Sequence, residues 1–312
     1  MTFNDINTLA KKKKPFLFIS DFKAKNIQVI ELDKLAEENI AFEINETPGT
    51  CKQQHSLRKY PISFEHYKEK FDKVQEEIKS GNTYLLNLTQ ETPIESAIDL
   101  EEIFNSVHAK YKLKYKDEFV CFSPEIFVKI KDSKIHTYPM KGTIDSAFLD
   151  AREKILEDAK EMSEHIMVVD LLRNDLSIKA KNVKVERFRY IEEIQAGVKN
   201  LLQVSSHISG ELENNWHENL GDILETLLPA GSISGTPKKS TVEIIEAVEG
   251  YDREYFSGVF GVYDGESFDS GVMIRFIQKK GAHLVYKSGG GITLESDARQ
   301  EYNEMLDKVY LP

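Results

Sequence analysis

Short apolar or alternating runs, separated by turn residues, recur along most of this chain. The clearest pair lies near the middle, where Glu125–Ile130 and Ile135–Met140 are strand-like and the polar segment Lys131–Lys134 between them predicts a turn. Two such runs joined by a short turn form an antiparallel hairpin, so antiparallel sheets are expected to dominate the fold. Further strands are expected at Phe16–Ser20, Ile27–Leu32, Ala41–Ile44, Tyr84–Thr89, Glu118–Phe122, Val183–Ile191, Leu201–Ile208, Phe256–Tyr263, Phe268–Ile277 and His283–Ser288.

Segments with helical periodicity are interleaved with these runs. Apolar residues recur three or four positions apart in Phe64–Ser80, in Ala151–Leu172 and in the terminal segment Ala298–Val309. Asp297 and Gln300 suit a capping box at the start of the last of these. The mixture predicts an α+β fold, a single large domain of stacked, mainly antiparallel sheets flanked by helices.

The composition narrows the class of function. The chain has 312 residues and a formal net charge of −11, which argues against nucleic-acid binding because that needs clustered positive charge. No apolar stretch approaches the length of a membrane span. The two cysteines, Cys51 and Cys121, are too few for a disulfide framework, and reduced thiols in a cytoplasmic protein are expected. Because no linker-like segment interrupts the chain, residues 1–312 are expected to form one domain.

A glutamate and a lysine form the first candidate site. If Lys131 and Ile135 flank the turn of the central hairpin, the register of its two strands is fixed. In that register Glu125 and Lys141 lie opposite each other, with Cβ atoms roughly 5 Å apart. A surface salt bridge gives the same pattern. The dipeptide Gly142–Thr143 after the lysine favours a ligand site, because glycine lets a ligand approach the backbone.

Two acidic pairs form the second candidate site. Glu161 and Glu164 are three residues apart on one predicted helix, and Glu301 and Glu304 repeat that spacing on the terminal helix. Two acidic faces brought together repel unless a cation lies between them, and Mg²⁺ prefers one or two carboxylates plus water and an anionic substrate. The alternative is two ordinary solvated helix faces.

An anion-binding set forms the third candidate site. Arg275 lies inside the apolar run Val272–Ile277, where a charge needs a partner, and a planar carboxylate suits a guanidinium. Gly289, Gly290 and Gly291 can present consecutive N–H groups as an anion nest. An internal salt bridge is an equally good explanation for the arginine. The run Pro229–Lys238 and the segment Asp170–Asp175 suit a helix start and a helix end, and neither implies chemistry by itself.

Many blocks of the sequence, in this order, resemble the chorismate-utilising enzymes, a family that includes anthranilate, aminodeoxychorismate, isochorismate and salicylate synthases. The resemblance spans residues 81–312, whereas residues 1–80 match only loosely. The matching blocks are YLLNLTQ (Tyr84–Gln90), SPEIF (Ser123–Phe127), PMKGT (Pro139–Thr143), EMSEHIMVVDLLRNDL (Glu161–Leu176), LPAGSISGTPK (Leu228–Lys238), REYFSGVFGVY (Arg253–Tyr263), Ile274–Arg275 and GGGITLESDARQEYNE (Gly289–Glu304).

The resemblance implies a magnesium-dependent enzyme that acts on chorismate. Glu164 and Glu304 match the family's magnesium ligands, and Glu161 and Glu301 match supporting acids. The metal is expected to hold the ring carboxylate of chorismate. Glu125 matches the acid that protonates the departing C4 hydroxyl.

The resemblance also implies a set of substrate contacts. Tyr255, Arg275 and the amides of the glycines at 289–291 match positions that grip substrate carboxylates. Gly142 and Thr143 match further contacts. The fold is expected to be that of the family.

Lys141 points to one branch of this family. A lysine in the block PMKGT is typical of aminodeoxychorismate synthases, in which it attacks C2 of the ring before ammonia enters at C4. Ammonia is expected from solution or from a separate glutamine amidotransferase. Water-using relatives carry a lysine base where this chain has Leu85, which disfavours isochorismate chemistry. Gln203 replaces a histidine common in relatives. An anthranilate synthase and a non-catalytic chorismate-binding homologue are the alternatives.

Overall fold

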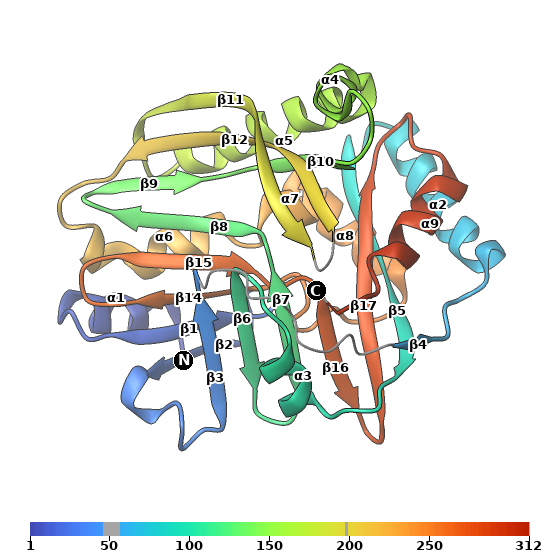
Figure 1. Ribbon diagram of the computed structural model, residues 1–312. Helices are drawn as coiled ribbons and strands as arrows, with labels where there is room; N and C mark the ends of the chain where they lie inside the picture. Colours follow the sequence, from blue (N-terminus) through green and yellow to red (C-terminus); the bar gives the residue numbers. More distant parts are fainter. Residues whose placement is uncertain (46–56, 197–198, 312) are drawn as a thin grey trace. The chain divides into compact units, whose positions relative to one another are not determined.

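The computed structural model describes residues 1–45, 57–196 and 199–311, which form two compact units. Each unit contains one sheet, and every strand pair described in it is antiparallel (Figure 1). The α+β class with mainly antiparallel sheets is confirmed, and the single domain 1–312 stays a prediction. Unit 1 consists of Met1–Lys34, Glu125–Ser232 and Gly258–Val272, and unit 2 of Leu35–Pro124, Ile233–Ser257 and Met273–Pro312.

The sheet of unit 1 carries the strands around the predicted lysine. Strands β9 and β10 pair with β12 one after the other, since Thr137 lies opposite Ile208 and Met140 lies opposite Ser205. The linked order is β10-β12-β9-β8-β15-β14-β1-β2, with β11 also paired to β12. These strands are β1 (Phe16–Ser20), β2 (Ile27–Glu31), β8 (Ile126–Lys131), β9 (Lys134–Thr137), β10 (Met140–Asp145), β11 (Lys181–Ala196), β12 (Lys199–Glu211), β14 (Val259–Tyr263) and β15 (Phe268–Val272).

The central hairpin has a tighter turn than the sequence predicted. Lys131 pairs with Lys134 across a two-residue turn, Asp132–Ser133, whose φ angles are 51° and 55°. Positive φ at both central residues is the geometry that matches the twist of the flanking strands. The register therefore differs by one residue, and β10 pairs with β12. The prediction that Glu125 and Lys141 are cross-strand partners was wrong.

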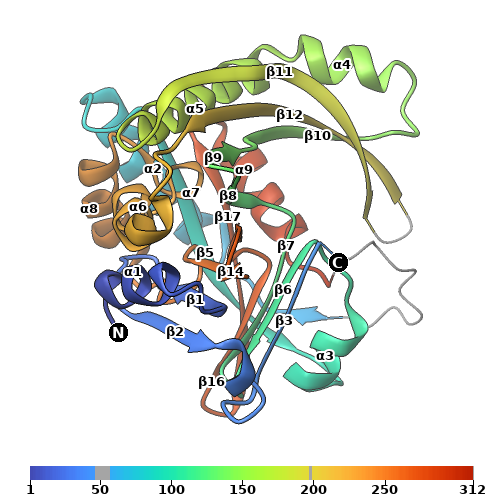
Figure 2. The ribbon, with the colours of Figure 1, turned by 90° about the vertical axis from the view of Figure 1, so that its left-hand side faces the viewer.

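The helices of unit 1 include the one that carries the first acidic pair. The predicted helix Ala151–Leu172 is two helices separated at Asp158, whose side chain accepts a hydrogen bond from the Glu161 N–H of the second helix. Figure 2 shows β11 and β12 as a long curved ribbon with α4 and α5 along one side. The helices are α1 (Phe3–Lys11), the 3-10 helix η1 (Leu32–Lys34), α4 (Ala151–Glu157), α5 (Ala159–Ser177), the 3-10 helix η2 (Trp216–Asn219) and α6 (Leu220–Leu227); the short α7 (Gly231–Ser234) begins in this unit.

The sheet of unit 2 is linked in the order β13-β5-β17-β16-β7-β6-β3, with β4 also paired to β5. Ile103, Phe122 and Ile277 belong to its buried apolar core. Cys121 is a buried free thiol in this sheet, whereas Cys51 lies outside the described residues. The strands are β3 (Ile40–Ile44), β4 (Arg58–Lys59), β5 (Leu85–Glu95), β6 (Tyr111–Tyr115), β7 (Phe119–Ser123), β13 (Gly235–Thr236), β16 (Phe276–Lys280) and β17 (His283–Ile292).

Helices α2 and α9 of unit 2 begin at ends capped by a side chain. The Ser63 hydroxyl accepts a hydrogen bond from the His66 N–H at the start of α2, and Asp297 accepts one from the Gln300 N–H at the start of α9, where a cap was predicted. No helix in the described ranges of either unit combines the length and the apolar character needed to cross a bilayer. The helices are α2 (Phe64–Lys79), α3 (Leu100–Ser106), α8 (Lys238–Glu249) and α9 (Ala298–Asp307).

One predicted strand, Phe268–Ile277, is interrupted. β15 ends at Val272 and β16 begins at Phe276, and between them Arg275 has a φ of 52°. A left-handed backbone cannot continue a β-ladder, so the strand breaks there. The prediction that Arg275 lies inside a strand was wrong.

Candidate functional site

Lys141 lies at a β-bulge in unit 1. The register of β10 against β12 shifts between Met140 and Thr143, and Gly142 in the bulge has a φ of 80°. A bulge inserts an extra residue and redirects the side chains beside it. The Lys141 Nζ lies 3.5 Å from the Glu164 Oε2, and 20% of the lysine side chain and 8% of the glutamate side chain are exposed. The structure therefore brings together the predicted nucleophile and one predicted metal ligand.

Gly142 lies beside the other glutamate of this helix. A Cβ placed on Gly142 would lie 3.4 Å from the Glu161 Oε2 and 3.5 Å from the Ile155 Cγ1. Glu161 and Glu164 are both on α5, three residues apart, so they extend from similar sides of the helix. Lysine, glycine and both acids of α5 thus form one cluster, which we call the lysine cluster: Lys141, Gly142, Glu161 and Glu164.

His165 lies directly behind this cluster and was not predicted as a site residue. Its side chain is 0% exposed, and its Nε2 lies 2.7 Å from the Ser206 Oγ of β12. Burial, together with the positive charges of Arg189 and Lys141, lowers the pKa of His165 to about 4. The imidazole is therefore neutral near pH 7, so it adds no positive charge beside the lysine. Its place next to Glu164 in the block EMSEHIM was the available sequence signal.

Glu125, the predicted acid, is held by a serine. It lies just before β8, and its Oε1 accepts a hydrogen bond from the Ser232 hydroxyl of α7. A Cβ placed on the preceding residue, Gly231, would lie 3.0 Å from the Asp175 Oδ2 at the far end of α5. The run Pro229–Lys238, to which the sequence assigned no chemistry, therefore supplies the partner of the predicted acid.

Tyr255 lies in an aromatic cluster of unit 2. Its ring centroid is 5.6 Å from that of Tyr115 and 5.3 Å from that of Phe119. Arg253, two residues earlier, is fully buried, and its Nε and Nη2 donate to the two carboxylate oxygens of Glu249 at 2.8 and 2.6 Å. This buried pair anchors the segment that carries Tyr255.

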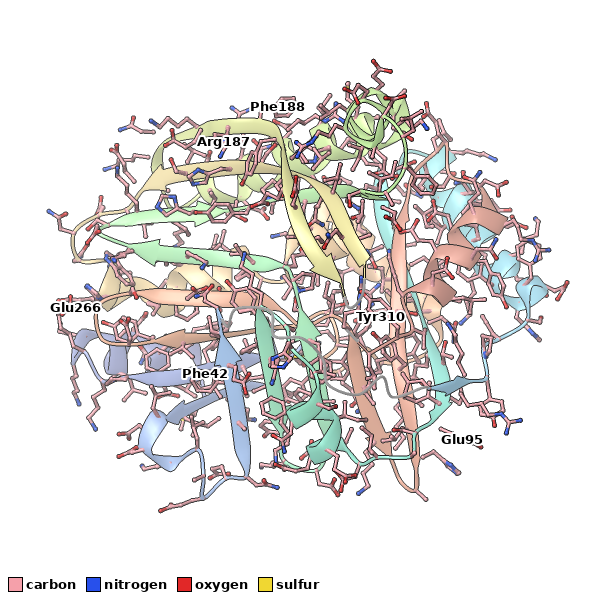
Figure 3. The ribbon with its side chains drawn as sticks, in the orientation of Figure 1. Phe42, Glu95, Arg187, Phe188, Glu266 and Tyr310 are labelled. Atoms are coloured by element: carbon pink, nitrogen blue, oxygen red, sulfur yellow. The ribbon has the colours of Figure 1, made fainter. Side chains whose placement is uncertain are left out.

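Arg275 adopts a strained backbone. Its φ of 52° is in the left-handed region, which costs an L-residue other than glycine of order 1–3 kcal/mol. Its guanidinium carbon lies 5.4 Å from the ring centroid of Tyr310, which Figure 3 labels near the end of the chain. Strain of this kind persists only where the surrounding structure fixes the residue, and the role of Arg275 as a substrate contact stays a prediction.

The glycine run lies beside the second acidic pair, within unit 2. A Cβ placed on Gly290 would lie 3.3 Å from the Glu301 Oε2 and 3.6 Å from the Glu304 Oε1. The Lys308 Nζ lies 2.6 Å from that same Glu304 oxygen and donates to the Gly289 carbonyl at 2.9 Å. Lys308, one turn beyond Glu304 on the chain, was not predicted as a site residue. Its i,i+4 spacing from that acid was the available signal.

The glycines form an extended strand. Gly289 and Gly291 lie opposite Thr89 and Asn87 in the ladder of β17 with β5. A nest needs alternating helical conformations, so the predicted anion nest was wrong. A Cβ on Gly289 would lie 2.2 Å from the Leu88 carbonyl oxygen, which explains glycine at that position by close packing. The role of these residues as substrate contacts stays a prediction.

The donor sets suit magnesium better than a transition metal. In the described part of the chain, no group of three or more His, Cys, Asp or Glu side chains is arranged to hold a metal ion. Magnesium needs only one or two protein carboxylates, with water and substrate oxygens completing its shell. Each acidic pair meets that requirement within its own unit, and Glu164 and Glu304 each have a lysine as a partner.

Two residues that separate branches of the resembling family are also placed. Gln203 lies directly opposite Thr143 in the pairing of β12 with β10, so the residue that replaces the relatives' histidine lies beside one predicted substrate contact. Leu85 is 3% exposed in β5 of unit 2. An alkyl side chain there cannot activate a water molecule.

Comparisons with known proteins show to which family this chain belongs. The family model described as chorismate binding enzyme matches residues 4–311. A protein of Haemophilus influenzae named "Uncharacterized PabA-like protein" is 46% identical over 310 residues, covering 98% of this chain and 94% of its own length. The aminodeoxychorismate synthase component 1 of Escherichia coli is 31% identical over 261 residues, covering 78% of this chain and 56% of its own length. The menaquinone-specific isochorismate synthase of Escherichia coli shares the fold, with a TM-score of 0.72 at 16% identity, covering 96% of this chain and 78% of that one. This chain belongs to the family of chorismate-binding enzymes.

Proposed function

We propose that this chorismate-utilising enzyme converts chorismate and ammonia to 4-amino-4-deoxychorismate. The observation that carries the proposal is Lys141, a largely buried lysine redirected by a bulge and paired with a buried carboxylate. Curated relatives named aminodeoxychorismate synthase component 1 support the same reaction. Leu85 weighs against water as the nucleophile, because it supplies no base.

The proposed chemistry has two displacement steps. The neutral amine of Lys141 forms a bond to C2 of the ring as the double bonds shift and the C4–O bond breaks. Glu125 donates the proton with which that oxygen leaves as water. Ammonia then forms a bond to C4, the double bonds shift back, and the lysine leaves with the electron pair of its C–N bond. Glu125 recovers a proton as the incoming ammonia becomes a neutral amino group.

The residues around each group support these roles. The Ser232 hydroxyl, which donates to Glu125, holds that carboxyl in one orientation. The carboxylate of Glu164 orients the lysine from one side. Arg275, Tyr255 and the glycines of β17 are proposed to bind the carboxylates of chorismate, for which a guanidinium fork and a phenol are suitable donors.

Magnesium is proposed as the cofactor, with Glu164 and Glu304 as ligands and Glu161 and Glu301 as supporting acids. When bound, the ion would offset the negative charge of the ring carboxylate of chorismate. Ammonia is proposed to come from solution or from a separate glutamine amidotransferase.

The test is product analysis by liquid chromatography and mass spectrometry, using the full chain with chorismate, Mg²⁺ and ammonium. Aminodeoxychorismate without released pyruvate is expected, whereas anthranilate with pyruvate would identify an anthranilate synthase. Lys141→Ala should lower turnover by at least about 100-fold, because no other group replaces the covalent step. Lys129→Ala is a matched control, since that lysine of β8 is 27% exposed and paired with Asp269 at 2.8 Å.

Withholding ammonia gives a second readout. The first displacement should then leave chorismate, minus water, attached to the peptide that contains Lys141. Unchanged turnover of Lys141→Ala would refute the covalent role of the lysine. Chorismate binding with no product at high ammonium would instead support a non-catalytic homologue.

A further inference from the structure

Two irregularities of the unit 1 sheet flank the same point of β12. On one side, β10 bulges at Gly142, and Met140 pairs with Ser205. On the other side, β11 bulges between Arg187 and Tyr190, and Tyr190 pairs with that same serine. Figure 3 labels Arg187 and Phe188 at the second bulge. Bulges redirect side chains, so irregular strands on both sides of Ser205 determine how the neighbouring side chains are oriented.

The second bulge contains a strained residue, Arg189, whose N–H binds the Ser206 hydroxyl. Arg189 has a φ of 47°, a left-handed conformation that a residue with a side chain adopts at a cost of roughly 1–2 kcal/mol. In this conformation the Arg189 N–H donates to the Ser206 Oγ at 2.9 Å. Its guanidinium donates to the carbonyls of Ile155 and Leu156, at the end of α4, at 3.2 and 2.9 Å. The strained residue therefore fixes both the serine hydroxyl and the helix that packs against Gly142.

Ser206 links the strained Arg189 to α5, because its hydroxyl also contacts His165 of that helix. Its hydroxyl oxygen accepts the Arg189 N–H and also lies 2.7 Å from the His165 Nε2, so one hydroxyl holds both groups. The histidine is 0% exposed, and the edge of its ring meets the Phe188 ring at a centroid distance of 5.9 Å.

These contacts form a closed ring of residues that includes the lysine. The Ser206 N–H donates to the Pro139 carbonyl at 2.9 Å, and Pro139 lies two residues before Lys141. His165 follows Glu164 on α5, and Glu164 approaches the lysine at 3.5 Å. The ring therefore runs from Lys141 through Pro139, Ser206, His165 and Glu164 back to Lys141. Glu164 and His165 lie about 100° apart around the axis of α5. Glu164 contacts Lys141, and His165 is linked through Ser206 to Pro139, so both ends of the segment 139–141 are tied to this helix.

We propose that His165 and Ser206 are positioning residues that set the separation between the Lys141 amine and the Glu164 carboxylate. This proposal rests on the proposed function, because it matters only if that lysine reacts. An amine held by one flexible side chain samples many positions, and reacting atoms misplaced by about 1 Å can lose about 100-fold in rate. Hydrogen bonding of the neighbouring His165 gives α5 a second fixed point beside the carboxylate and so reduces that freedom.

The experiment compares two buried serines of the unit 1 sheet. Ser206→Ala removes the shared hydroxyl. Ser270→Ala is the control, since Ser270 is also 0% exposed and makes two hydrogen bonds, both to the Val128 backbone. Ser206→Ala should lower kcat about 10- to 100-fold and raise the Mg²⁺ concentration for half-maximal rate, with KM for chorismate changed less than about 2-fold. Ser270→Ala should lower the melting temperature by a similar amount and leave all three kinetic constants within about 2-fold.

Variants of the histidine separate hydrogen bonding from packing. His165→Gln, which keeps a polar group that can reach Ser206, should recover at least about one third of the kcat that His165→Leu loses. Equal kinetics for Ser206→Ala and Ser270→Ala, or equal loss in both histidine variants, would overturn the proposal. Calorimetric titration of each variant with Mg²⁺ gives a readout that does not depend on turnover. Failure of the proposed function would look different, because the wild-type chain would then form no aminodeoxychorismate.

Discussion

Replacing Gly142 by alanine tests whether the bulge in β10 places the lysine. Gly142 has a φ of 80°, and an alanine there is strained whatever space surrounds it. The new Cβ would lie 3.4 Å from the Glu161 Oε2 and 3.5 Å from the Ile155 Cγ1, which are ordinary contact distances. The cost therefore comes from the backbone and not from a clash. A left-handed L-residue costs roughly 1–2 kcal/mol, which should appear as that much loss in the free energy of unfolding.

The loss of activity should exceed this loss of stability. To relieve the strain, the backbone at residue 142 must rotate toward negative φ, which turns the peptide that carries the Lys141 side chain. A displacement of about 1 Å at the amine is expected to lower kcat by about 10- to 100-fold. Steady-state kinetics with chorismate, Mg²⁺ and ammonium measure kcat, and urea unfolding followed by circular dichroism measures stability.

Gly250 provides a matched control. Its φ is 73°, nearly that of Gly142, and a Cβ there would meet nothing within 4 Å. Gly250→Ala should lose a similar 1–2 kcal/mol by the same mechanism, and it should keep wild-type kcat because α8, which it ends, carries none of the proposed catalytic residues. If Gly142→Ala is destabilised as Gly250→Ala is but retains full kcat, the reasoning that links the bulge to the lysine is refuted.

Two further predictions concern buried charges in unit 2. Burial lowers the pKa of Lys287 to about 8 against a usual 10.5, so the unfolded chain binds more protons at this lysine between those pH values and the free energy of unfolding should rise with pH across that window. Lys287→Met should lack this rise in pH-dependent urea unfolding, and an identical slope in the variant would contradict the assignment. Glu249→Gln leaves the fully buried Arg253 without its ion-pair partner and should cost about 3–5 kcal/mol in urea unfolding. Lys68→Ala removes an ion pair in which both side chains are half exposed, so it should lower the free energy of unfolding by less than about 1 kcal/mol. Equal losses in the two variants would show that burial does not make the Arg253–Glu249 pair more important for stability.

The parts of the fold that follow from periodicity were predictable. Helix α2 was expected at Phe64–Ser80 and is found one residue shorter, because apolar residues three and four apart define one buried face. Strand β1 was expected and found at Phe16–Ser20. Both signals are local: they depend on the side chains of consecutive residues and not on what packs against them.

The failures have physical causes that periodicity does not carry. In the helix expected at Ala151–Leu172, the apolar periodicity continues across Asp158. The helix nevertheless breaks there, because the Asp158 carboxylate caps the start of α5. The hairpin register depended on whether Asp132–Ser133 closes the turn alone, a choice made by positive φ at two residues that are not glycine. The extent of β15 depended in the same way on the backbone of Arg275.

The candidate site was predictable as a set of residues but not as a set of contacts. The block resemblance identified Lys141 and Glu164, and the structure pairs them. Nothing in the sequence indicated which side chains would hold them, because Ser206 is 41 positions from His165 along the chain and lies on a different element. Long-range partners of this kind are set by strand pairing, and a single sequence leaves that pairing open.

Residues with positive φ occur both where the predictions were wrong and beside the candidate site residues. Gly142, Arg189 and Arg275 all have φ between 47° and 80°, and each lies beside a proposed functional group of its own unit. Glycine adopts this conformation freely, but each arginine pays a strain that favourable packing elsewhere must offset. A chain selected for stability alone would place asparagine or glycine at 189 and 275. Arginine at 189 is explained by its guanidinium, which donates to two carbonyls at the end of α4. At 275 the guanidinium lies over the Tyr310 ring, and a substrate carboxylate as a further partner stays a prediction. The same conformation also occurs at residues outside the candidate site, such as Lys13 and Ala24, so positive φ alone does not identify a functional residue.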